Sequence, residues 1–204
     1  MNPRLKKILL FILLPFFLSL LFTACDSGST PAKKSRATTP KSTAAAIPDQ
    51  LLLAEIDGRP VTGTDLKKYL GLFKESEMVW PAKPETREKL INHLIDRELL
   101  LEAARKQGYF KIDELKKHGH LQPSECETIA LRAFLNDKIA RPATPDQAAI
   151  TNYRKQHPDL SAKQAREKLA SARQIELFKN LMASLKKEHK IVIHRENLTK
   201  LPTS

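Results

Sequence analysis

The chain has 204 residues, with 35 Lys and Arg against 23 Asp and Glu, and a formal net charge of +12. Its 2 Cys exclude a disulfide-stapled small domain and a site of four thiolates, and its 6 scattered Gly argue against a phosphate-binding loop. This length is that of one domain with an appendage, and the high charge and low glycine content favour a helical protein.

The first segment is typical of a secretory signal peptide. Three cations in Met1–Lys7 precede an almost wholly apolar run over Ile8–Phe22, which is shorter than the roughly 20 residues that span a bilayer. Residues 21–25 read LFTAC and resemble the lipobox of bacterial lipoproteins. The resemblance implies cleavage before Cys25 and diacylglyceryl and fatty-acyl (palmitate) chains on Cys25. The alternative is an ordinary signal peptide, or an uncleaved anchor with a chance cysteine.

Asp26 follows directly, and in bacterial lipoproteins an Asp at this place implies retention in the inner membrane. We therefore expect a protein of the cell envelope, lipid-anchored and facing the periplasm or exterior, with the inner membrane favoured.

Residues 25–48 are rich in Ser, Thr, Pro, Ala and Lys, with Ile47 as the one apolar β-branched residue. They cannot bury enough apolar surface to offset the entropy of ordering, so we expect a disordered tether with a reach of about 25 Å. The expected organisation is a signal peptide over 1–24, the tether over 25–48 and one domain over 49–204. Residues 49–204 hold 28 cations and 22 anions, a mildly basic balance that argues against a nucleic-acid-binding protein.

The domain begins with a short apolar run, Leu52–Ile56, and a strong turn signal, Asp57-Gly58. Thr62 and Asp65 then have the spacing of a capping box, with Thr62 as N-cap. The helix that follows places its apolar residues on one face: Leu66, Tyr69, Leu70 and Phe73.

Three helices are predicted between Glu85 and Ala140. The first is long, from about Glu85 to Gln107, and ends at Gly108. Its apolar stripe is Leu90, Ile91, Leu94, Ile95, Leu99 and Ala103. The second is short, over Lys111–His118, and the third covers Ser124–Ala140 and stops before Pro142. A capping box at Thr144, with Pro145 at the first helical position, begins another helix, which ends before His157-Pro158.

The last helix is capped at Ser161 and runs to about Lys190, with an apolar stripe at Ile175, Phe178, Met182 and Leu185. Ile191–Ile193 then reads as a strand without a neighbouring partner. Because a lone strand is not viable, we pair it with Leu52–Ile56. The predicted fold is mainly α, with a small two-stranded sheet that joins the N- and C-terminal segments.

This order resembles the N-terminal chaperone module of SurA/PrsA-type periplasmic foldases. The family pattern LI-x-x-x-LL-x-x-x-A-x-x-x-G is met within Ile91–Tyr109 by Leu94, Ile95, Leu99, Leu100, Ala103 (or Ala104) and Gly108. The segment Thr144–Ser161 resembles the family's helix that leads into the isomerase. The resemblance implies an N-terminal module over 51–140 and a returning helix and strand over 161–198.

The parvulin-type prolyl isomerase domain of those foldases, roughly 90 residues long, has no counterpart here, because His157-Pro158-Asp159-Leu160 runs directly into the last helix. The label of peptidyl-prolyl isomerase is therefore not expected to apply, and we expect no enzyme. The implied function is ATP-independent binding of unfolded or partly folded exported polypeptides by a membrane-anchored, chaperone-like lipoprotein. The alternative is a dedicated assembly or scaffold lipoprotein that binds one envelope partner.

Apolar side chains outside the helical stripes are the candidate client-binding residues: Met78, Trp80, Tyr109, Phe110 and Leu121. The alternative is that these side chains fill the core of a small helical domain.

No catalytic, metal or cofactor site is predicted. His118 and His120 could supply two metal ligands, but no acid or thiol lies at ligand spacing. Cys126 is expected to be a free or half-buried thiol, with an intermolecular disulfide as the alternative. Glu98 and Glu102, one helical turn apart among cations, are expected to form a solvated charged face rather than a catalytic pair.

Overall fold

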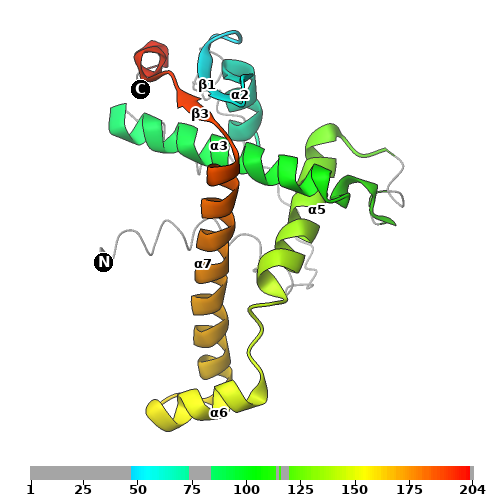
Figure 1. Cartoon of the computed structure of the whole chain (residues 1–204), viewed down its shortest axis with the longest axis vertical. Coiled ribbons are helices and arrows are strands. Elements are labelled where there is room, and N and C mark those ends of the chain that lie inside the picture. The colour runs from blue at the N-terminus through cyan, green and yellow to red at the C-terminus, as the bar shows by residue number, and fades with distance from the viewer. Residues whose placement is uncertain (1–46, 74–83, 114, 116–119, 203–204) are drawn as a thin grey trace, which may run out of the picture. The chain divides into compact units, whose positions relative to one another are not determined.

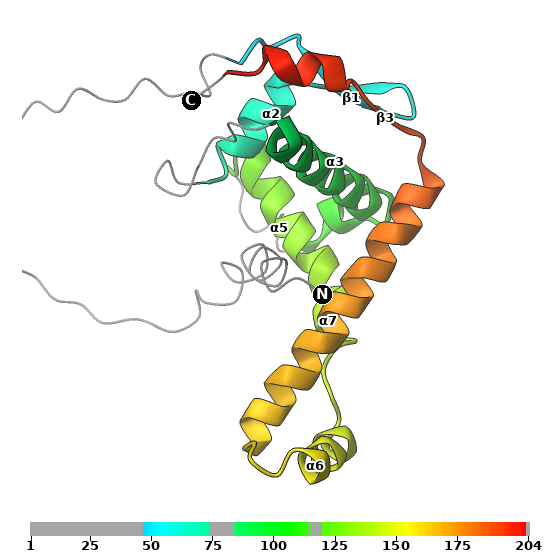
Figure 2. The same cartoon turned by 90° about the vertical axis from the view of Figure 1, so that its left-hand side faces the viewer.

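The computed structural model describes residues 47–73, 84–113, 115 and 120–202. It is mainly helical with a small antiparallel sheet, as Figures 1 and 2 show. The strands are β1 (Leu52–Ile56), β2 (Arg59–Thr62) and β3 (Ile191–Ile193). The α-helices are α2 (Gly63–Leu70), α3 (Pro84–Lys106), α5 (Pro123–Leu135), α6 (Gln147–Gln156) and α7 (Ala162–Glu188). Single helical turns η4 (Tyr109–Lys111), η5 (Asn136–Ala140, of π type) and η6 (Arg195–Lys200) complete the described chain.

The sheet has three strands in the order β2-β1-β3. The predicted pairing of the N- and C-terminal strands is confirmed, since Ala54, Glu55 and Ile56 of β1 stand opposite the three residues of β3. The predicted number of two strands is wrong. Asp57 and Gly58 adopt positive φ angles of 50° and 78°, and this tight turn folds Arg59–Thr62 back onto β1 as a hairpin. Pro60 is tolerated there because β2 is an edge strand.

Side-chain contacts fix β3 at both ends. Before the strand, Asp57 Oδ2 lies 2.6 Å from His189 Nδ1, and Asp57 Oδ1 accepts a hydrogen bond of 2.7 Å from the Lys190 backbone N–H. After the strand, His194 Nε2 lies 2.9 Å from Glu55 Oε1. The returning segment is therefore attached to the β1–β2 hairpin by polar contacts as well as by the ladder.

The core is built around α3, which packs against α2, α5, α7, β1 and η6. The predicted stripe of α3 is buried, with Ile91, Leu94 and Leu99 fully enclosed. Side chains from every neighbouring element meet it: Leu53, Ala54 and Ile56 of β1, Leu66 and Leu70 of α2, Phe134 of α5, Met182 and Leu185 of α7, and Leu198 of η6. At the N-terminal half of α3, the buried Arg87 guanidinium donates to the carbonyls of Leu198 (3.0 Å) and Pro202 (3.2 Å), which fixes the chain after β3.

The compact unit begins before the expected boundary at residue 49. The Ile47 side chain is only 1% exposed and belongs to the core. The chain enters the domain past Gly63, where a Cβ atom would lie 1.9 Å from the Pro48 carbonyl oxygen. Gly63 is therefore required for this close approach, and any shortened protein needs to retain Ile47.

Helix ends agree with the sequence in some places and differ in others. Gly108 ends α3 with a φ of 83°, as predicted, and Ser161 caps α7 with the expected reciprocal bonds to Gln164. The prediction that α6 begins at Thr144 is wrong. Asp146 is the N-cap, because its carboxylate accepts a 2.7 Å hydrogen bond from the Ala149 N–H.

Two further helices depart from the predicted bounds. Helix α2 ends at Leu70, so Phe73 lies beyond the helix and is 43% exposed instead of extending its apolar face. The predicted helix over Ser124–Ala140 is observed as α5 followed by the wider turn η5. Half of the predicted helix over Lys111–His118 lies outside the described residues, at positions 114 and 116–118.

Candidate binding surface

Four predicted site residues lie outside the described part of the chain: Cys25, Asp26, Met78 and Trp80. Among the described residues, no helix is both long and apolar enough to cross a membrane. The lipidation and sorting assignments therefore stay predictions.

Tyr109, Phe110 and Leu121 are described, and all three are half-buried. The Tyr109 hydroxyl donates a 2.6 Å hydrogen bond to Asp137 Oδ2, and its ring packs edge-on against Phe134 at 5.4 Å between centroids. The Phe110 ring lies under the Arg105 guanidinium, 4.9 Å from its carbon. Both rings thus have partners within the chain, and Tyr109 and Phe110 pack against the core.

The most exposed large apolar side chains of the described chain are not among these predicted residues. Leu72 and Phe73, just after α2, are 42% and 43% exposed, and the Phe73 ring packs edge-on against Tyr69 at 5.2 Å. They form one adjacent pair, which we call the Leu72–Phe73 pair, whereas Ile175 and Val192 lie on other elements. Sequence reasoning missed Leu72 and placed Phe73 on the apolar face of the helix. Gly71, a poor helix former, was the available signal that the helix ends there.

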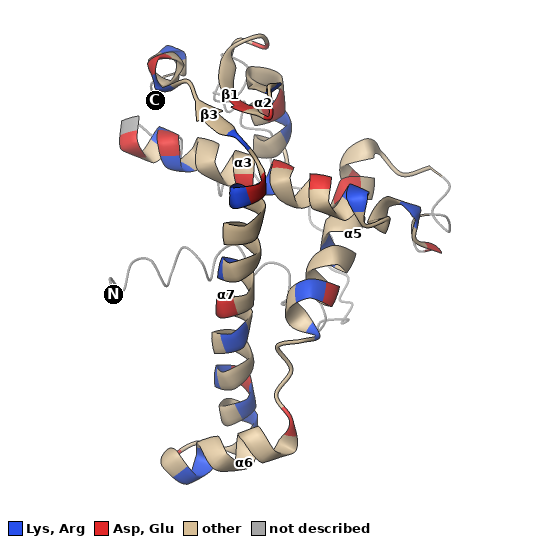
Figure 3. Cartoon of the chain, viewed as in Figure 1, with Lys and Arg blue, Asp and Glu red and all other residues tan. Residues whose placement is uncertain are grey.

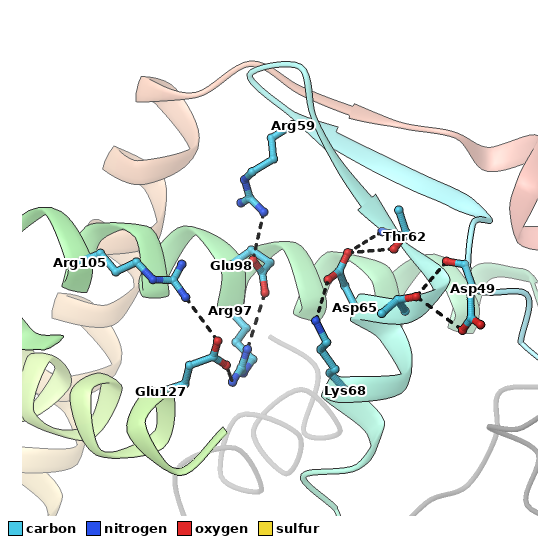
Figure 4. Close-up of polar contacts among 10 residues, drawn as sticks. Asp49, Arg59, Thr62, Asp65, Lys68, Arg97, Glu98, Arg105 and Glu127 are labelled. Atoms are coloured by element: carbon cyan, nitrogen blue, oxygen red, sulfur yellow. Dashed lines mark hydrogen bonds and ion pairs between the residues drawn. The ribbon is translucent and has the colours of Figure 1, made fainter. Parts of the chain in front are cut away.

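The charged face of α3 is neutralised by neighbouring elements (Figure 4). Glu127 of α5 accepts from Arg97 at 2.7 Å and from Arg105 at 3.3 Å. Glu98 accepts from Arg59 of β2 at 3.3 Å and lies 3.6 Å from Arg97. These ion pairs link the β1–β2 hairpin, α3 and α5 into one network.

Glu98 and Glu102 belong to this network, as the sequence predicted for a charged face. Glu102 lies 2.8 Å from Lys106 Nζ, and this hydrogen-bonded cation lowers the pKa of the Glu102 carboxyl. Arg59 lies 3.3 Å from Glu98 and 4.0 Å from Glu102, so cations hold both carboxylates.

Helices α6 and α7 carry a different kind of surface, which we call the α6–α7 hairpin (Gln147–Glu188). Figure 3 shows Lys and Arg along α7 with few acids between them, whereas acids and cations alternate along α3. From Gln147 to Glu188 there are nine Lys and Arg against four Asp and Glu, and the rest of residues 49–204 is nearly balanced, with 19 against 18. The excess positive charge of the domain is therefore concentrated in this hairpin.

The apolar stripe of α7 is covered only in part. Met182 and Leu185 are buried against the main core, Phe178 is half-buried, and Ile175 is 42% exposed. At the other end of α7, Ala165 is buried together with Ile150 and Leu160, outside the main core cluster. Helix α6 packs chiefly on α7, so the middle of α7 is left accessible.

The remaining chemistry of the described residues is sparse. Cys126 is half-buried and forms no disulfide. No group of three metal-binding side chains occurs among the described residues, and His118 lies outside them. Burial lowers the pKa of His93, while hydrogen bonding to Glu55 raises the pKa of His194.

The chain matches no protein-family model, no curated protein and no solved structure. The resemblance to SurA/PrsA-type foldases therefore stays a prediction that rests on the residues quoted for it.

Proposed function

We propose that this chain is a membrane-anchored, chaperone-like lipoprotein that binds unfolded or partly folded exported polypeptides without ATP. The lipid anchor is Cys25, with the domain held outside the inner membrane. The proposal assigns no catalysis and no cofactor, because the binding of extended chains needs neither.

The observation that carries the proposal is the way the chain closes. A long returning helix, α7, ends in a strand that pairs with the first strand of the domain. This is the arrangement expected from the resemblance to the foldase chaperone module, without the intervening isomerase. It supports a chaperone module that is complete as one compact unit.

The Leu72–Phe73 pair is the described surface that best suits apolar clients. Adjacent exposed apolar side chains beside a charged surface mark interaction sites, and this pair is followed directly in the sequence by the segment that contains Met78 and Trp80. Its small size also favours the alternative, a scaffold lipoprotein that binds one envelope partner.

Aggregation of several unrelated unfolded proteins tests the proposal. The protein is the mature chain from Cys25 with Cys25→Ser, which cannot carry the lipid and retains the buried Ile47. We expect equimolar amounts to suppress aggregation of all of them. The double variant Leu72→Ser/Phe73→Ser and the variant Trp80→Ala should each need a higher concentration, by roughly tenfold for the double variant, because the apolar area that a client covers is lost.

Val192→Ser is the matched control, since Val192 is 39% exposed but lies on β3. It should suppress aggregation as well as the parent does. No suppression of any client by the parent would contradict the general chaperone and favour the scaffold with one partner.

A further inference from the structure

We propose that the α6–α7 hairpin binds the anionic headgroups of a phospholipid membrane. The inference rests on the proposed function for the nearness of that membrane, and on the described side chains for the chemistry of the contact.

Most cations of the hairpin form no ion pair with a described residue. Of its nine Lys and Arg, Lys186 pairs with Asp96 at 2.6 Å and Arg154 donates to the Leu160 carbonyl. The other seven form no ion pair with a described residue: Lys155, Lys163, Arg166, Lys168, Arg173, Lys179 and Lys187. In contrast, Arg59, Arg97 and Arg105 around α3 all lie within ion-pair distance of carboxylates. The hairpin therefore keeps its positive charge available for an external anion.

One side of α7 has the composition of a helix that lies on a membrane surface. Lys168, Ala172, Ile175 and Lys179 follow at spacings of four, three and four residues, and all four are exposed. Two cations thus flank one small and one larger apolar side chain. Helices with this pattern lie in the plane of the interface, where apolar side chains enter the headgroup boundary and cations meet anionic lipids.

The expected anchor keeps the domain close to such a surface. Only 21 residues lie between Cys25 and the buried Ile47, and the tether expected there has a reach of about 25 Å. Helix α7 has 27 residues and is thus about 40 Å long. Because the reach is shorter than α7 itself, the cations sample the zone next to the membrane where its negative potential acts.

The arrangement of these cations favours a lipid surface over an acidic protein segment. Lys168 and Lys179 lie on one side of α7, three turns and about 16 Å apart along its axis, and a broad, flat, negatively charged surface meets both at once. Attraction of this kind supplies on the order of fivefold in partitioning for each Lys or Arg near the surface.

Vesicle co-sedimentation of the mature chain with Cys25→Ser tests the proposal, because binding then owes nothing to the lipid anchor. We expect binding to vesicles of phosphatidylcholine mixed with phosphatidylglycerol, and little to phosphatidylcholine alone. Salt near 1 M should abolish binding, since the screening length falls to about 3 Å. The variant Lys168→Glu/Lys179→Glu should bind the anionic vesicles at least about tenfold more weakly.

The matched control is Lys89→Glu/Lys111→Glu, which changes the net charge equally at two exposed cations on α3 and η4 that form no ion pair with a described residue. It should retain most of the binding. Circular dichroism of both variants checks that they fold.

Three results would overturn the inference: no binding to the anionic vesicles, equal binding to both vesicle types, or equal losses in the two double variants. Binding to soluble polyglutamate but not to vesicles would assign the hairpin to an acidic polypeptide instead. None of these results bears on aggregation suppression, so the proposed chaperone function stands or fails separately.

Discussion

The two longest helices, α3 and α7, differ in what covers them. α3 buries apolar side chains along its length, and most of its charges pair with carboxylates and cations, among them those of β2, α5 and η6. α7 is buried near its ends, at Ala165 and at Met182 and Leu185, and most of its cations form no ion pair with a described residue. Both helices mix apolar and charged residues in similar proportion, so composition alone does not separate a central helix from a partly covered one.

This difference predicts that α3 determines the stability of the whole domain, whereas α6 and α7 contribute mainly an accessible surface. Removing an enclosed side chain of α3 affects every element that packs there, whereas α6 depends on its contacts with α7. We therefore expect two kinds of response to comparable substitutions, global in the first region and local in the second.

The largest expected effect is on the core. Leu94→Ala removes a fully enclosed side chain from α3 and should lower the global free energy of unfolding by about 2–5 kcal/mol, measured by urea denaturation. Ile150→Ala, in the small α6–α7 core, should destabilise α6 but leave the unfolding of the main core within about 0.5 kcal/mol of the parent value, because we expect α6 to open locally.

Amide hydrogen exchange shows whether the effect of Ile150→Ala is local to α6. In Ile150→Ala the amides of α6 should exchange roughly tenfold faster or more, while those of α3 keep their protection. An equal global loss in both variants would mean that α6–α7 unfolds together with the main core, and the proposed contrast would be wrong.

Much of the fold was predictable because it depends on local patterns. The buried stripe of α3, its end at Gly108 and the cap of α7 at Ser161 follow from periodicity and from the chemistry of helix ends. The pairing of β1 with β3 followed from a weaker argument, that a lone strand needs a partner.

The features that the sequence did not predict depend on contacts between residues that are distant in the sequence. Ile175 shares a periodic stripe with Met182, but periodicity reports a face and not how far the neighbouring helices extend over it. β2 was missed because Pro60 argues against a strand unless its place at the sheet edge is known. The same limit applies to the binding surface, since the exposure of Phe73 depends on where α2 stops.

A smaller effect is expected at the start of α6. Asp146→Ala removes the carboxylate that accepts from the Ala149 N–H, and should destabilise α6 by about 1 kcal/mol. Thr144→Ala, at the predicted but incorrect N-cap, should have almost no effect, because its exposed hydroxyl donates to the Ala140 carbonyl at a long 3.3 Å. Local exchange rates in α6 measure both; equal effects would restore Thr144 as the cap.

The smallest effect is a pH dependence with opposite signs at the sheet and on α3. Hydrogen bonding to Glu55, helped by Glu196, raises the pKa of His194 above its ordinary value of 6.5. The folded protein therefore binds this proton more tightly than the unfolded chain does. The stabilisation is complete below about pH 6.5 and is lost as the pH rises through the pKa of the folded state. His194→Gln should remove this loss from the stability profile.

His93 on α3 behaves in the opposite way. Burial lowers its pKa below 6.5, although Asp96 counteracts this and Lys186 adds to it. The unfolded chain then binds the proton more tightly, so stability is lost as the pH falls below about 6.5. Urea titrations across this range with His93→Gln and His194→Gln should remove the acid-side and alkaline-side losses separately. If either variant removed both the acid-side and the alkaline-side loss of stability, the prediction would be wrong. The two histidines would then act on one shared element instead of separately on the sheet and on α3.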